Sequence, residues 1–430
     1  MILIKNIDIV TQNKKRQIIK NGAIVIDGDT IKKIGPNKEI EKEYAKQAQK
    51  IINGRGQVAL PGLINTHTHL AMSLLRGYAD DLLLEDWWQN YIYPIESKFS
   101  REEVYWGSLL AMLEMIKSGT TCFADFYYYE NEVGRAAQEI GMRGILGCAI
   151  LDFPTFYFKT AVGAFKKIEK LIKTKTKLTD FAVAPHMIQT TSLETYKKAK
   201  KIAREHNLLL TTHLGETKQE VNFCLKKYKK RPVELLEENG ILDERSFLAH
   251  CCWLNKKEIK ILARSGASVA HCPVSNMKLA SGTMPLKKMA QAGVNVSLGT
   301  DGACSNNSLD MFGEMKTAAL AHKSHSLDPT LAGAQTVLDM ATINGAKALG
   351  LDNEIGSLEP CKKADIMIID FKKPHLTPCH NLVSNIVYAA KGSDVETVII
   401  NGKIIMENRK IKGVDEKKVL RKIEKIAKFK

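Results

Sequence analysis

The segment 57-QVALPGLINTH-67 indicates the fold most directly, because a nearly continuous apolar run ends in a polar residue. Apolar runs of this kind are typical of parallel strands that are covered on both faces. Seven more runs follow along the chain, and helical stretches separate them. The seven runs are 119-GTTCFADF-126, 144-GILGCAIL-151, 181-FAVAPHM-187, 208-LLLTTHL-214, 246-SFLAHCC-252, 267-ASVAHCP-273 and 294-VNVSLGTDG-302. Eight strands that alternate with helices predict an α/β fold, the (β/α)8 TIM barrel.

Polar side chains recur at the carboxyl ends of these predicted strands. They are His67, His186, His213, His250, His271 and Asp301. Barrel enzymes build their active sites at the carboxyl ends of the strands. We therefore expect these side chains to lie around one barrel mouth.

The first 58 residues contain short strand patterns, and no helix of any strength is expected there. The patterns lie in 2-ILIKNIDIVT-11 and in 23-AIVIDGDTIKKIG-35, whose Asp27-Gly28 pair is a two-residue hairpin signal. A chain end of this kind needs further strands to complete a sheet.

Short strand patterns occur again beyond residue 360, in 364-ADIMIIDF-371 and 396-ETVIINGKIIMENRKIKG-413. In the second of these, Asn401 and Gly402 supply another turn. We therefore expect the two chain ends to pair into one small β-sandwich domain. Its predicted extent is residues 1–58 and 360–430, and residues 59–359 are predicted to form the barrel. The final segment, 416–430, places apolar residues on one helical face, which we expect to pack on the body of the protein.

The composition excludes several classes of protein. The chain has 430 residues, of which 44% are hydrophobic and 26% charged, as is typical of a globular protein. No stretch approaches the roughly 20 apolar residues that a membrane-spanning helix needs. Lys5 and Asp8 interrupt the apolar start where a signal peptide would have its hydrophobic region. We therefore expect neither secretion nor membrane insertion.

The net charge is +16, from 63 Lys and Arg against 47 Asp and Glu. The lysines alternate with glutamates on predicted helix surfaces, as in 165-FKKIEKLIKTKTK-177, which favours a solvated surface over a nucleic-acid site. The nine cysteines include no CxxC pair and favour reduced thiols in a cytoplasm. The expected partner is a small molecule, with neither nucleic acid nor membrane.

His67 and His69 point to the same side of a strand, because alternate strand residues share a face. Alone, such a pair is more often two surface or capped histidines than a metal site. With His213 and Asp301 at other strand ends, three nitrogens and one oxygen face the same mouth. This donor set suits a first-row divalent ion, most simply Zn²⁺, with an open position for water. Residues 181–190 contain no lysine that could bridge two metals, so a single ion is expected.

Glu216 follows His213 by three residues and can face the same cavity as a general acid/base. Considered alone, Glu216 would be interpreted as a solvated glutamate in a loop. Its proximity to the predicted metal ligand His213 favours the catalytic role instead. His250 is expected to touch the hydrolytic water, whereas His271 remains open between the site and a hydrogen bond to backbone. A divalent ion lowers the pKa of its bound water to about 7, and hydrolysis of a C–N bond fits these groups best. The remaining histidines are expected to be structural or on the surface: His206, His322, His325, His375 and His380.

Five motifs, in this order along nearly the whole chain, resemble the amidohydrolase superfamily and, within it, the 5-methylthioadenosine/S-adenosylhomocysteine deaminases. The motifs are 60-LPGLINTHTHLAMSLLRG-77, 211-TTHLGET-217, 247-FLAHCCWLN-255, 271-HCPVSNMKLASG-282 and 299-GTDGACSNNSLDMF-312. The resemblance implies one zinc ion per subunit, with Fe²⁺ as an alternative, and a homo-oligomer, either a dimer or a tetramer. The metal ligands that it implies are His67, His69, His213 and Asp301.

The same resemblance implies the chemistry. Water adds to C6 of an adenine ring, Glu216 protonates the ring nitrogen N1, and His250 and Asp301 orient and deprotonate the water. Glu96 then accepts hydrogen bonds from the ribose hydroxyls, and His186 contacts the nucleoside. Glu96 follows the aromatic segment 86-DWWQNYIY-93, whose Trp87 and Trp88 cover the ligand or pack into the core.

One departure from the family pattern bears on the substrate. Cys148 stands where these deaminases have an arginine that pairs with the carboxylate of S-adenosylhomocysteine. A thiol cannot form that bidentate pair, although Arg143 could reach the site in another register. We therefore expect a preference for substrates without a carboxylate tail, such as 5'-methylthioadenosine, 5'-deoxyadenosine or adenosine.

Two other functions remain open at this level. The first is hydrolysis of another amino- or chloro-substituted heterocycle, of the triazine, pterin or guanine type, because a fold and a metal do not fix the substrate. The presence of Glu96 argues against it, since a small-ring hydrolase has no use for a ribose-binding carboxylate. The second is a non-catalytic scaffold, which would have lost some of the ligands that this chain retains.

Overall fold

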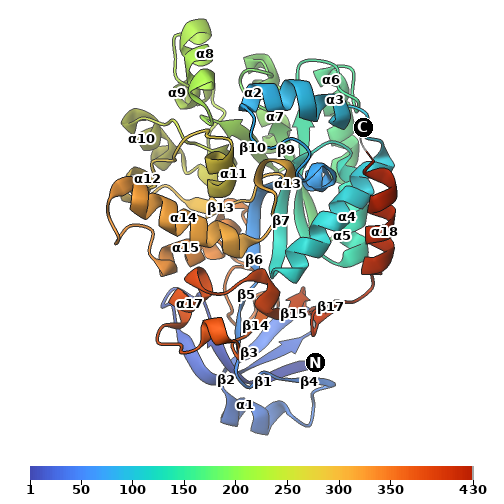
Figure 1. Cartoon of the computed structure of the whole chain (residues 1–430), viewed down its shortest axis with the longest axis vertical. Coiled ribbons are helices and arrows are strands. Elements are labelled where there is room, and N and C mark those ends of the chain that lie inside the picture. The colour runs from blue at the N-terminus through green and yellow to red at the C-terminus, as the bar shows by residue number, and fades with distance from the viewer. Residues whose placement is uncertain (429–430) are drawn as a thin grey trace.

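The computed structural model describes residues 1–428 and consists of a helix-covered barrel on top of a smaller sheet domain (Figure 1). The amino terminus lies in the small domain, whereas the last helix lies beside the barrel (Figure 1). Within these residues, no helix is long and apolar enough to cross a membrane.

Eight parallel strands form the barrel in the order of the chain, as predicted. They are β6 (Leu63–Thr68), β7 (Thr120–Tyr127), β8 (Arg143–Ile150), β9 (Thr179–Pro185), β10 (Leu209–Leu214), β11 (Ser246–His250), β12 (Ser268–His271) and β13 (Val296–Leu298). The Thr66 hydroxyl donates to the Leu298 carbonyl at 2.8 Å, so the first and last strands also meet. The barrel is therefore nearly closed, and its carboxyl ends face away from the small domain.

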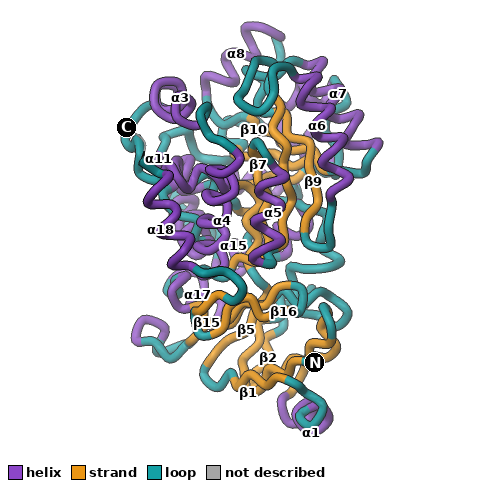
Figure 2. The backbone as a smooth tube through the Cα atoms, turned by 90° about the vertical axis from the view of Figure 1, so that its right-hand side faces the viewer, coloured by secondary structure: helices purple, strands orange, loops and turns teal. Residues whose placement is uncertain are grey.

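Helices cover the outside of the barrel and its mouth (Figure 2). The helices along the barrel wall are α4 (Arg101–Lys117), α5 (Glu130–Ile140), α6 (Ala161–Leu171), α7 (Leu193–Glu205), α8 (Lys218–Tyr228), α9 (Pro232–Glu238), α10 (Lys256–Ser265), α12 (Leu286–Ala292), α14 (Met311–Ser326), α15 (Ala334–Met340) and α16 (Ile343–Ala348). Shorter helices lie in the loops: η1 (Leu70–Leu75), α2 (Leu84–Asp86), η2 (Trp87–Ile92), α3 (Tyr93–Glu96), η3 (Ile172–Thr174), α11 (Pro273–Lys278) and α13 (Ala303–Asn306). Local sequence sets several starts, as where Asn255 and Glu258 form a capping box on α10.

The two ends of the chain form one mixed sheet, as predicted for the small domain. Its strands are β1 (Ile2–Val10), β2 (Ile18–Asp27), β3 (Thr30–Pro36), β4 (Lys50–Asn53), β5 (Gln57–Pro61), β14 (Ile366–Asp370), β15 (Val395–Ile400), β16 (Lys403–Glu407) and β17 (Lys410–Ile411). β5 lies between β1 and β14 and so joins the two ends in one continuous sheet. The helices η4 (Pro374–Leu376), α17 (Leu382–Tyr388) and η5 (Gly392–Asp394) connect its last strands.

Both predicted hairpins are present. Asn401 and Gly402 have φ values of 50° and 75°, as a two-residue loop with both residues in the left-handed region requires. In the first hairpin Asp27 pairs with Thr30, so the loop residues are Gly28 and Asp29, one position later than the predicted pair.

The run 57–67 is two strands and not one. β5 ends at Pro61 in the small sheet, and β6 begins at Leu63 in the barrel. Gly62 lies between them, where a Cβ would come within 2.1 Å of the Thr121 side chain. A glycine at this position lets the chain pass between the two sheets.

A helix, α1 (Asn37–Tyr44), lies in the amino-terminal segment where no helix was expected. Pro36 ends the preceding strand, and Ile40 and Tyr44, four residues apart, are both buried on one face. The expectation that this segment contains no helix was wrong. Ile40 and Tyr44 are the only apolar residues of the helix, and two residues are too few to show a helical pattern in the sequence.

The terminal helix α18 (Glu416–Ile426) packs on α4, as expected for an apolar stripe. Val419 is buried there, and Glu416 pairs with Lys117 at 2.7 Å. Helix α18 therefore lies on the barrel although its residues fall in the range predicted for the small domain. The predicted domain boundaries themselves remain a prediction.

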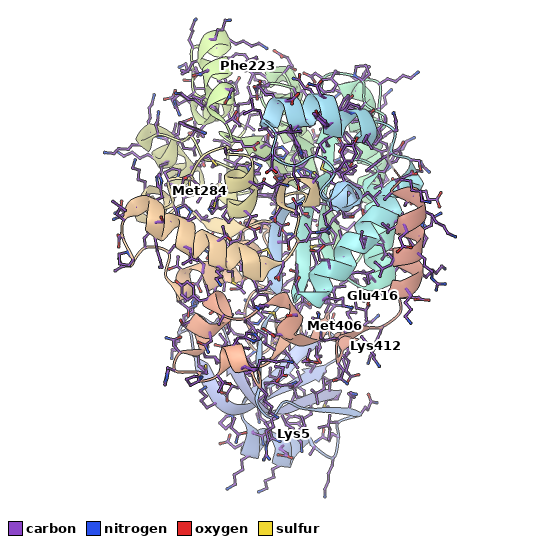
Figure 3. All side chains as sticks on the ribbon, in the orientation of Figure 1. Lys5, Phe223, Met284, Met406, Lys412 and Glu416 are labelled. Carbon is purple, nitrogen blue, oxygen red and sulfur yellow. The ribbon has the colours of Figure 1, made fainter. Side chains whose placement is uncertain are left out.

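Lys5 and Lys412, two of the residues labelled in Figure 3, each lie beside an acidic residue. Lys5 in the small domain pairs with Glu41, and Lys412 pairs with Glu407 at 2.8 Å. These pairs agree with the expectation of a solvated surface of mixed sign.

Candidate functional site

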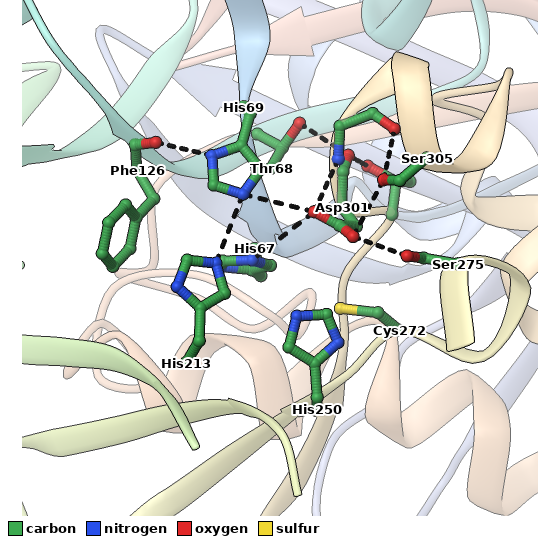
Figure 4. A network of polar contacts seen from close by, with 12 residues as sticks. His67, Thr68, His69, Phe126, His213, His250, Cys272, Ser275, Asp301 and Ser305 are labelled. Atoms are coloured by element: carbon green, nitrogen blue, oxygen red, sulfur yellow. Dashed lines mark hydrogen bonds and ion pairs between the residues drawn. The ribbon is translucent and has the colours of Figure 1, made fainter. Parts of the chain in front are cut away.

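Four predicted ligands converge at the carboxyl ends of three strands (Figure 4). His67 lies near the end of β6, His69 follows that strand directly, His213 lies on β10, and Asp301 follows β13. The Nε2 atom of His69 lies 3.4 Å from Nε2 of His213 and 3.2 Å from Oδ1 of Asp301. The Nε2 atom of His67 lies 3.7 Å from the same carboxylate oxygen. These donor atoms therefore surround one point.

Backbone carbonyls orient two of the histidines. The Nδ1 atom of His69 donates to the Phe126 carbonyl at 2.6 Å, and Nδ1 of His213 donates to the His186 carbonyl at 3.0 Å. A carbonyl only accepts, so the hydrogen of each neutral ring is at Nδ1. The lone pair at each Nε2 therefore faces the common point, as in histidine metal ligands.

Asp301 presents one oxygen to the histidines and keeps the other in hydrogen bonds. Its Oδ2 accepts from the Ser275 hydroxyl at 2.5 Å and from the Ser305 hydroxyl at 2.9 Å. Its backbone has φ 62°, a left-handed conformation that is uncommon for a residue other than glycine. The chain thus turns sharply after β13 and directs Oδ1 to the histidines.

The electrostatics of this cluster favour a single cation at its centre. Burial lowers the pKa of His67 and His213 well below the ordinary value, so both rings are neutral donors. Burial also acts to lower the pKa of His69, but the hydrogen bond and charge of Asp301 outweigh it and raise that pKa to about 9, so without an ion His69 itself carries the positive charge beside Asp301. Binding of a metal ion would release the proton from Nε2 of His69 and leave the neutral ring with hydrogen at Nδ1. Against its own burial, the carboxyl of Asp301 has a lowered pKa because of His69.

A buried nitrogen atom without a hydrogen-bond partner indicates whether these residues fit a metal ion. Among the described residues, Nε2 of His67 has no hydrogen-bond partner although it is fully buried. Buried polar atoms are rarely left unpaired. Three imidazole nitrogens and one carboxylate oxygen are the donor set of a divalent first-row ion such as zinc, so the residues fit such a group.

Glu216 lies in the loop after β10 and faces the same cluster. Its Oε1 accepts from the Ser281 hydroxyl at 3.2 Å, and its Oε2 lies 3.8 Å from Nε2 of His250. Its backbone N–H donates to the buried Glu220 carboxyl at 3.0 Å. The side chain is therefore held from two sides and is placed for proton transfer.

His250 joins the cluster and His271 does not. The His250 ring lies 5.5 Å from the rings of His67 and His213, and its Nδ1 accepts from Asn276 at 2.8 Å. The Nε2 atom of His271 lies 2.9 Å from Nε2 of the buried His322 on α14. His271 was expected either to join the site or to bond to the backbone. It does neither, because its ring contacts the side chain of His322.

A partly aromatic wall lies beside the cluster. The Trp88 ring stacks on His186 with ring centroids 6.5 Å apart, whereas Trp87 is buried in the core. Core packing is therefore confirmed for Trp87, and contact of Trp88 with a ligand stays a prediction. Glu96 is buried at the end of α3, and burial raises its pKa to about 7. The hydroxyl of Tyr127 acts on Glu96 in the opposite direction.

Cys148 and Arg143 lie at opposite ends of β8. Cys148 is buried near the carboxyl end of this strand, and Arg143 is its first residue. The guanidinium of Arg143 forms a buried ion pair at 2.8 Å with Asp365, the residue just before β14. Arg143 therefore lies at the end of the barrel that faces the small domain, and it cannot substitute for an arginine at the mouth.

The sequence did not identify the residues that hold the site residues in place. These are Ser275, Asn276, Ser281 and Ser305. These residues could have been found only by their presence in the motifs 271–282 and 299–312. Serine and asparagine are common on protein surfaces, so residue type alone does not mark them as part of a site.

The chain is similar to known proteins over nearly its whole length. A model of the amidohydrolase family matches residues 58–405. A 5-methylthioadenosine/S-adenosylhomocysteine deaminase of Thermoanaerobacter pseudethanolicus is 46% identical over 99% of this chain and 98% of its own. A 5'-deoxyadenosine deaminase of Methanosarcina barkeri is 43% identical over 99% of this chain and 97% of its own. Among solved structures, an adenosine deaminase from Xanthomonas campestris with bound zinc is 33% identical, with a TM-score of 0.96 over 99% of this chain and 97% of that one.

Proposed function

The chain belongs to the amidohydrolase family and is a hydrolase of C–N bonds, and on that premise we propose that it is a metal-dependent deaminase of adenosine-type nucleosides. The observation that carries the proposal is the convergence of three imidazole nitrogens and one carboxylate oxygen beside Glu216. The names of the relatives support the nucleoside as substrate.

We propose His67, His69, His213 and Asp301 as the ligands of one Zn²⁺ ion, and Fe²⁺ suits the same donors. The zinc in the Xanthomonas structure supports zinc as the first choice. A divalent ion bound here lowers the pKa of a water molecule to about 7 and so supplies a nucleophile near neutral pH.

The chain's own residues supply the proton transfers. Water adds its oxygen to C6 of the adenine ring while Glu216 gives a proton to N1. Asp301 takes a proton from the water, and His250 orients that water. Asp301 then passes the proton of the water to the amino group, which leaves C6 as ammonia. The hydroxyl on C6 returns its proton to Glu216 as it becomes a carbonyl, so both carboxyl groups regain their starting states. The products are the inosine-type nucleoside and ammonia.

Glu96 and His186 serve the nucleoside in this proposal. A carboxylate accepts two hydrogen bonds, which suits the 2'- and 3'-hydroxyls of ribose. His186 and the stacked Trp88 form one wall for the base or the sugar. We further propose a preference for nucleosides without a carboxylate tail, because Cys148 is a buried thiol and Arg143 is paired with Asp365.

Ammonia release by the zinc-loaded protein tests the function. The panel contains adenosine, 5'-methylthioadenosine, 5'-deoxyadenosine, S-adenosylhomocysteine, guanine and melamine. We expect release from the nucleosides, with a higher kcat/KM for 5'-methylthioadenosine than for S-adenosylhomocysteine. A clear preference for S-adenosylhomocysteine contradicts the proposed specificity. Release from guanine or melamine alone favours the alternative, a hydrolase of substituted heterocycles.

The assembly and location belong to the same proposal. We propose a cytoplasmic homo-oligomer, a dimer or a tetramer, that needs no nucleic acid or membrane partner. Light scattering on the eluting peak of a size-exclusion column measures its mass, and a monomer at micromolar concentration contradicts it.

A further inference from the structure

Helix α11 carries two adjacent polar residues that reach two different groups of the site. The hydroxyl of Ser275 donates to Oδ2 of Asp301 at 2.5 Å. The amide Nδ2 of Asn276, the next residue, donates to Nδ1 of His250 at 2.8 Å. Both side chains are buried, so water does not compete with these bonds. Figure 4 shows Ser275 and Asp301 on one side of the cluster and His250 on another.

The partner of Nδ1 decides which hydrogen-bonding role the other ring nitrogen plays. In a neutral imidazole one nitrogen carries the hydrogen and the other accepts. His69 and His213 donate from Nδ1 to carbonyls, so their Nε2 atoms offer lone pairs. His250 accepts at Nδ1 from an amide N–H, so its Nε2 carries the hydrogen. The Nε2 atoms of His69 and His213 are therefore acceptors, whereas the Nε2 atom of His250 is a hydrogen-bond donor.

The distinction matters because His250 lies within reach of a metal ion. The nearest donor atoms of His67, His250 and Asp301 lie within 4.8 Å of one another and could hold an ion as a second set. An Nε2 atom that carries hydrogen cannot be a ligand. It can donate to the oxygen of a water molecule that lies between Asp301 and Glu216.

We propose that Asn276 is a positioning residue that holds His250 in the Nε2–H tautomer. His250 then donates a hydrogen bond to the reacting water and is neither a metal ligand nor the base. The carboxylate of Asp301 is left as the group that takes the proton of the water. The catalytic part of this inference rests on the proposed function.

The backbone around His250 shows that its direction is imposed by the surroundings. His250 and Cys251 have φ values of 71° and 53°, two successive left-handed residues other than glycine. Such conformations persist where neighbouring bonds enforce them. The Cys251 N–H donates to the Leu214 carbonyl at 3.0 Å, and Asn276 fixes the ring from the other side.

The tautomer of His250 can be measured without any substrate. Protein labelled with ¹⁵N-histidine and loaded with zinc is examined by NMR, and the His250 signals are assigned by their loss in His250→Ala. We expect hydrogen on Nε2 and a bare Nδ1. Hydrogen on Nδ1 overturns the inference. A protein that shows the expected tautomer but releases no ammonia from nucleosides disproves the proposed function and leaves the tautomer assignment standing.

Variants test the role of Asn276. In Asn276→Asp, the carboxylate accepts from Nδ1–H and so reverses the tautomer. We expect that reversal by NMR and a kcat lowered by about 10–100-fold, as for residues that orient a reactive group, with KM little changed. In Asn276→Ala, we expect a mixture of tautomers and a smaller loss of kcat.

Asn295→Asp is the matched control. Asn295 is a partly buried asparagine before β13 that donates to Ser268 and to the Asn344 carbonyl, far along the chain from α11. We expect it to keep the wild-type tautomer and kcat. Equal losses of kcat in Asn276→Asp and Asn295→Asp, or an unchanged tautomer in Asn276→Asp, contradict the role of Asn276.

Discussion

At the scale of single residues, His67 and Glu216 lie in the same cluster and have separable roles. Among residues 1–428, Nε2 of His67 is a buried nitrogen without a partner, whereas Glu216 is held by Ser281 and by Glu220. The first is placed to bind an ion and the second to move a proton. Substitution of His67 should therefore remove the metal ion, whereas substitution of Glu216 should lower kcat and leave the metal ion bound.

Glu216→Gln should keep the metal and lose about 10²–10⁴-fold in kcat, the usual contribution of a general acid/base. His67→Ala should lose the metal itself. Metal content and kcat, measured on the same preparations, separate the two effects. The exposed His206 supplies a control, since His206→Ala should keep both. Near wild-type activity in Glu216→Gln would show that its assigned role is wrong.

Glu96 gives the site a pH dependence of its own. Burial raises the pKa of its carboxyl from 4.5 to about 7, so the group ionises only as the pH rises through 7. The ionised form accepts stronger hydrogen bonds from ribose hydroxyls than the neutral acid does. We expect kcat/KM for adenosine to rise between pH 6 and 8, with a midpoint of about 7.

Two controls isolate this effect. Glu96→Gln cannot ionise, so its profile should lack the rise near pH 7. The substrate 2',3'-dideoxyadenosine has no hydroxyls for Glu96 to bind and should lack the rise in the wild-type protein as well. A rise that persists in both cases assigns the titration to another group.

The convergence of the proposed site residues could be predicted from the sequence, and the residues that hold them in place could not. His67, His213 and Asp301 follow apolar strands, so the barrel alone brings them together. Ser275 and Asn276 reach the site only because α11 folds over the mouth. The sequence does not encode that packing in any periodic pattern.

At the scale of elements, strand patterns predicted the barrel and did not resolve where one sheet gives way to the other. The run 57–67 is uniformly apolar because β5 and β6 are both buried, although in different sheets. Burial pattern therefore cannot locate the boundary, and only Gly62 marks it. Helix α1 was missed for the opposite reason, since only two of its three buried residues, Ile40 and Tyr44, are apolar.

Helix α18 offers a test of packing that leaves the site unchanged. Val419 is 1% exposed against the barrel, and its neighbour Leu420 is 45% exposed. Val419→Asp buries a charge without a partner, so we expect a loss of about 2–4 kcal/mol in the free energy of unfolding. Leu420→Asp should change it by less than about 0.5 kcal/mol. Chemical denaturation measures both, and equal effects contradict the observed packing; kcat should be unchanged at 25 °C.

At the scale of the whole molecule, a buried ion pair joins the two domains. Arg143 at the start of β8 pairs with Asp365 just before β14, and Asp365 also accepts from the Asn401 N–H at 2.7 Å. Against burial, the charge and hydrogen bond of Asp365 raise the pKa of Arg143 above its ordinary value. The guanidinium of Arg143 thus keeps its charge at the junction.

Removal of one partner should be far more costly than removal of both. Arg143→Ala leaves the Asp365 carboxylate buried without its partner, and we expect a loss of about 3–5 kcal/mol in the free energy of unfolding. The double variant Arg143→Met with Asp365→Asn should recover part of that loss. Denaturant curves of the single and double variants measure the difference. A single variant as stable as the wild type contradicts a structural role for the pair.

The single-residue passage at Gly62 has a consequence for how such a protein can be altered. The strand that carries His67 and His69 is the direct continuation of a strand of the small sheet, so its height in the barrel is anchored from outside the barrel. An isolated barrel, cut free at residue 62, would lose the anchor of two of its four proposed ligands. The small sheet therefore supports the strand that carries two of the proposed ligands, so we expect an exchange of the small domain between relatives to disturb the site.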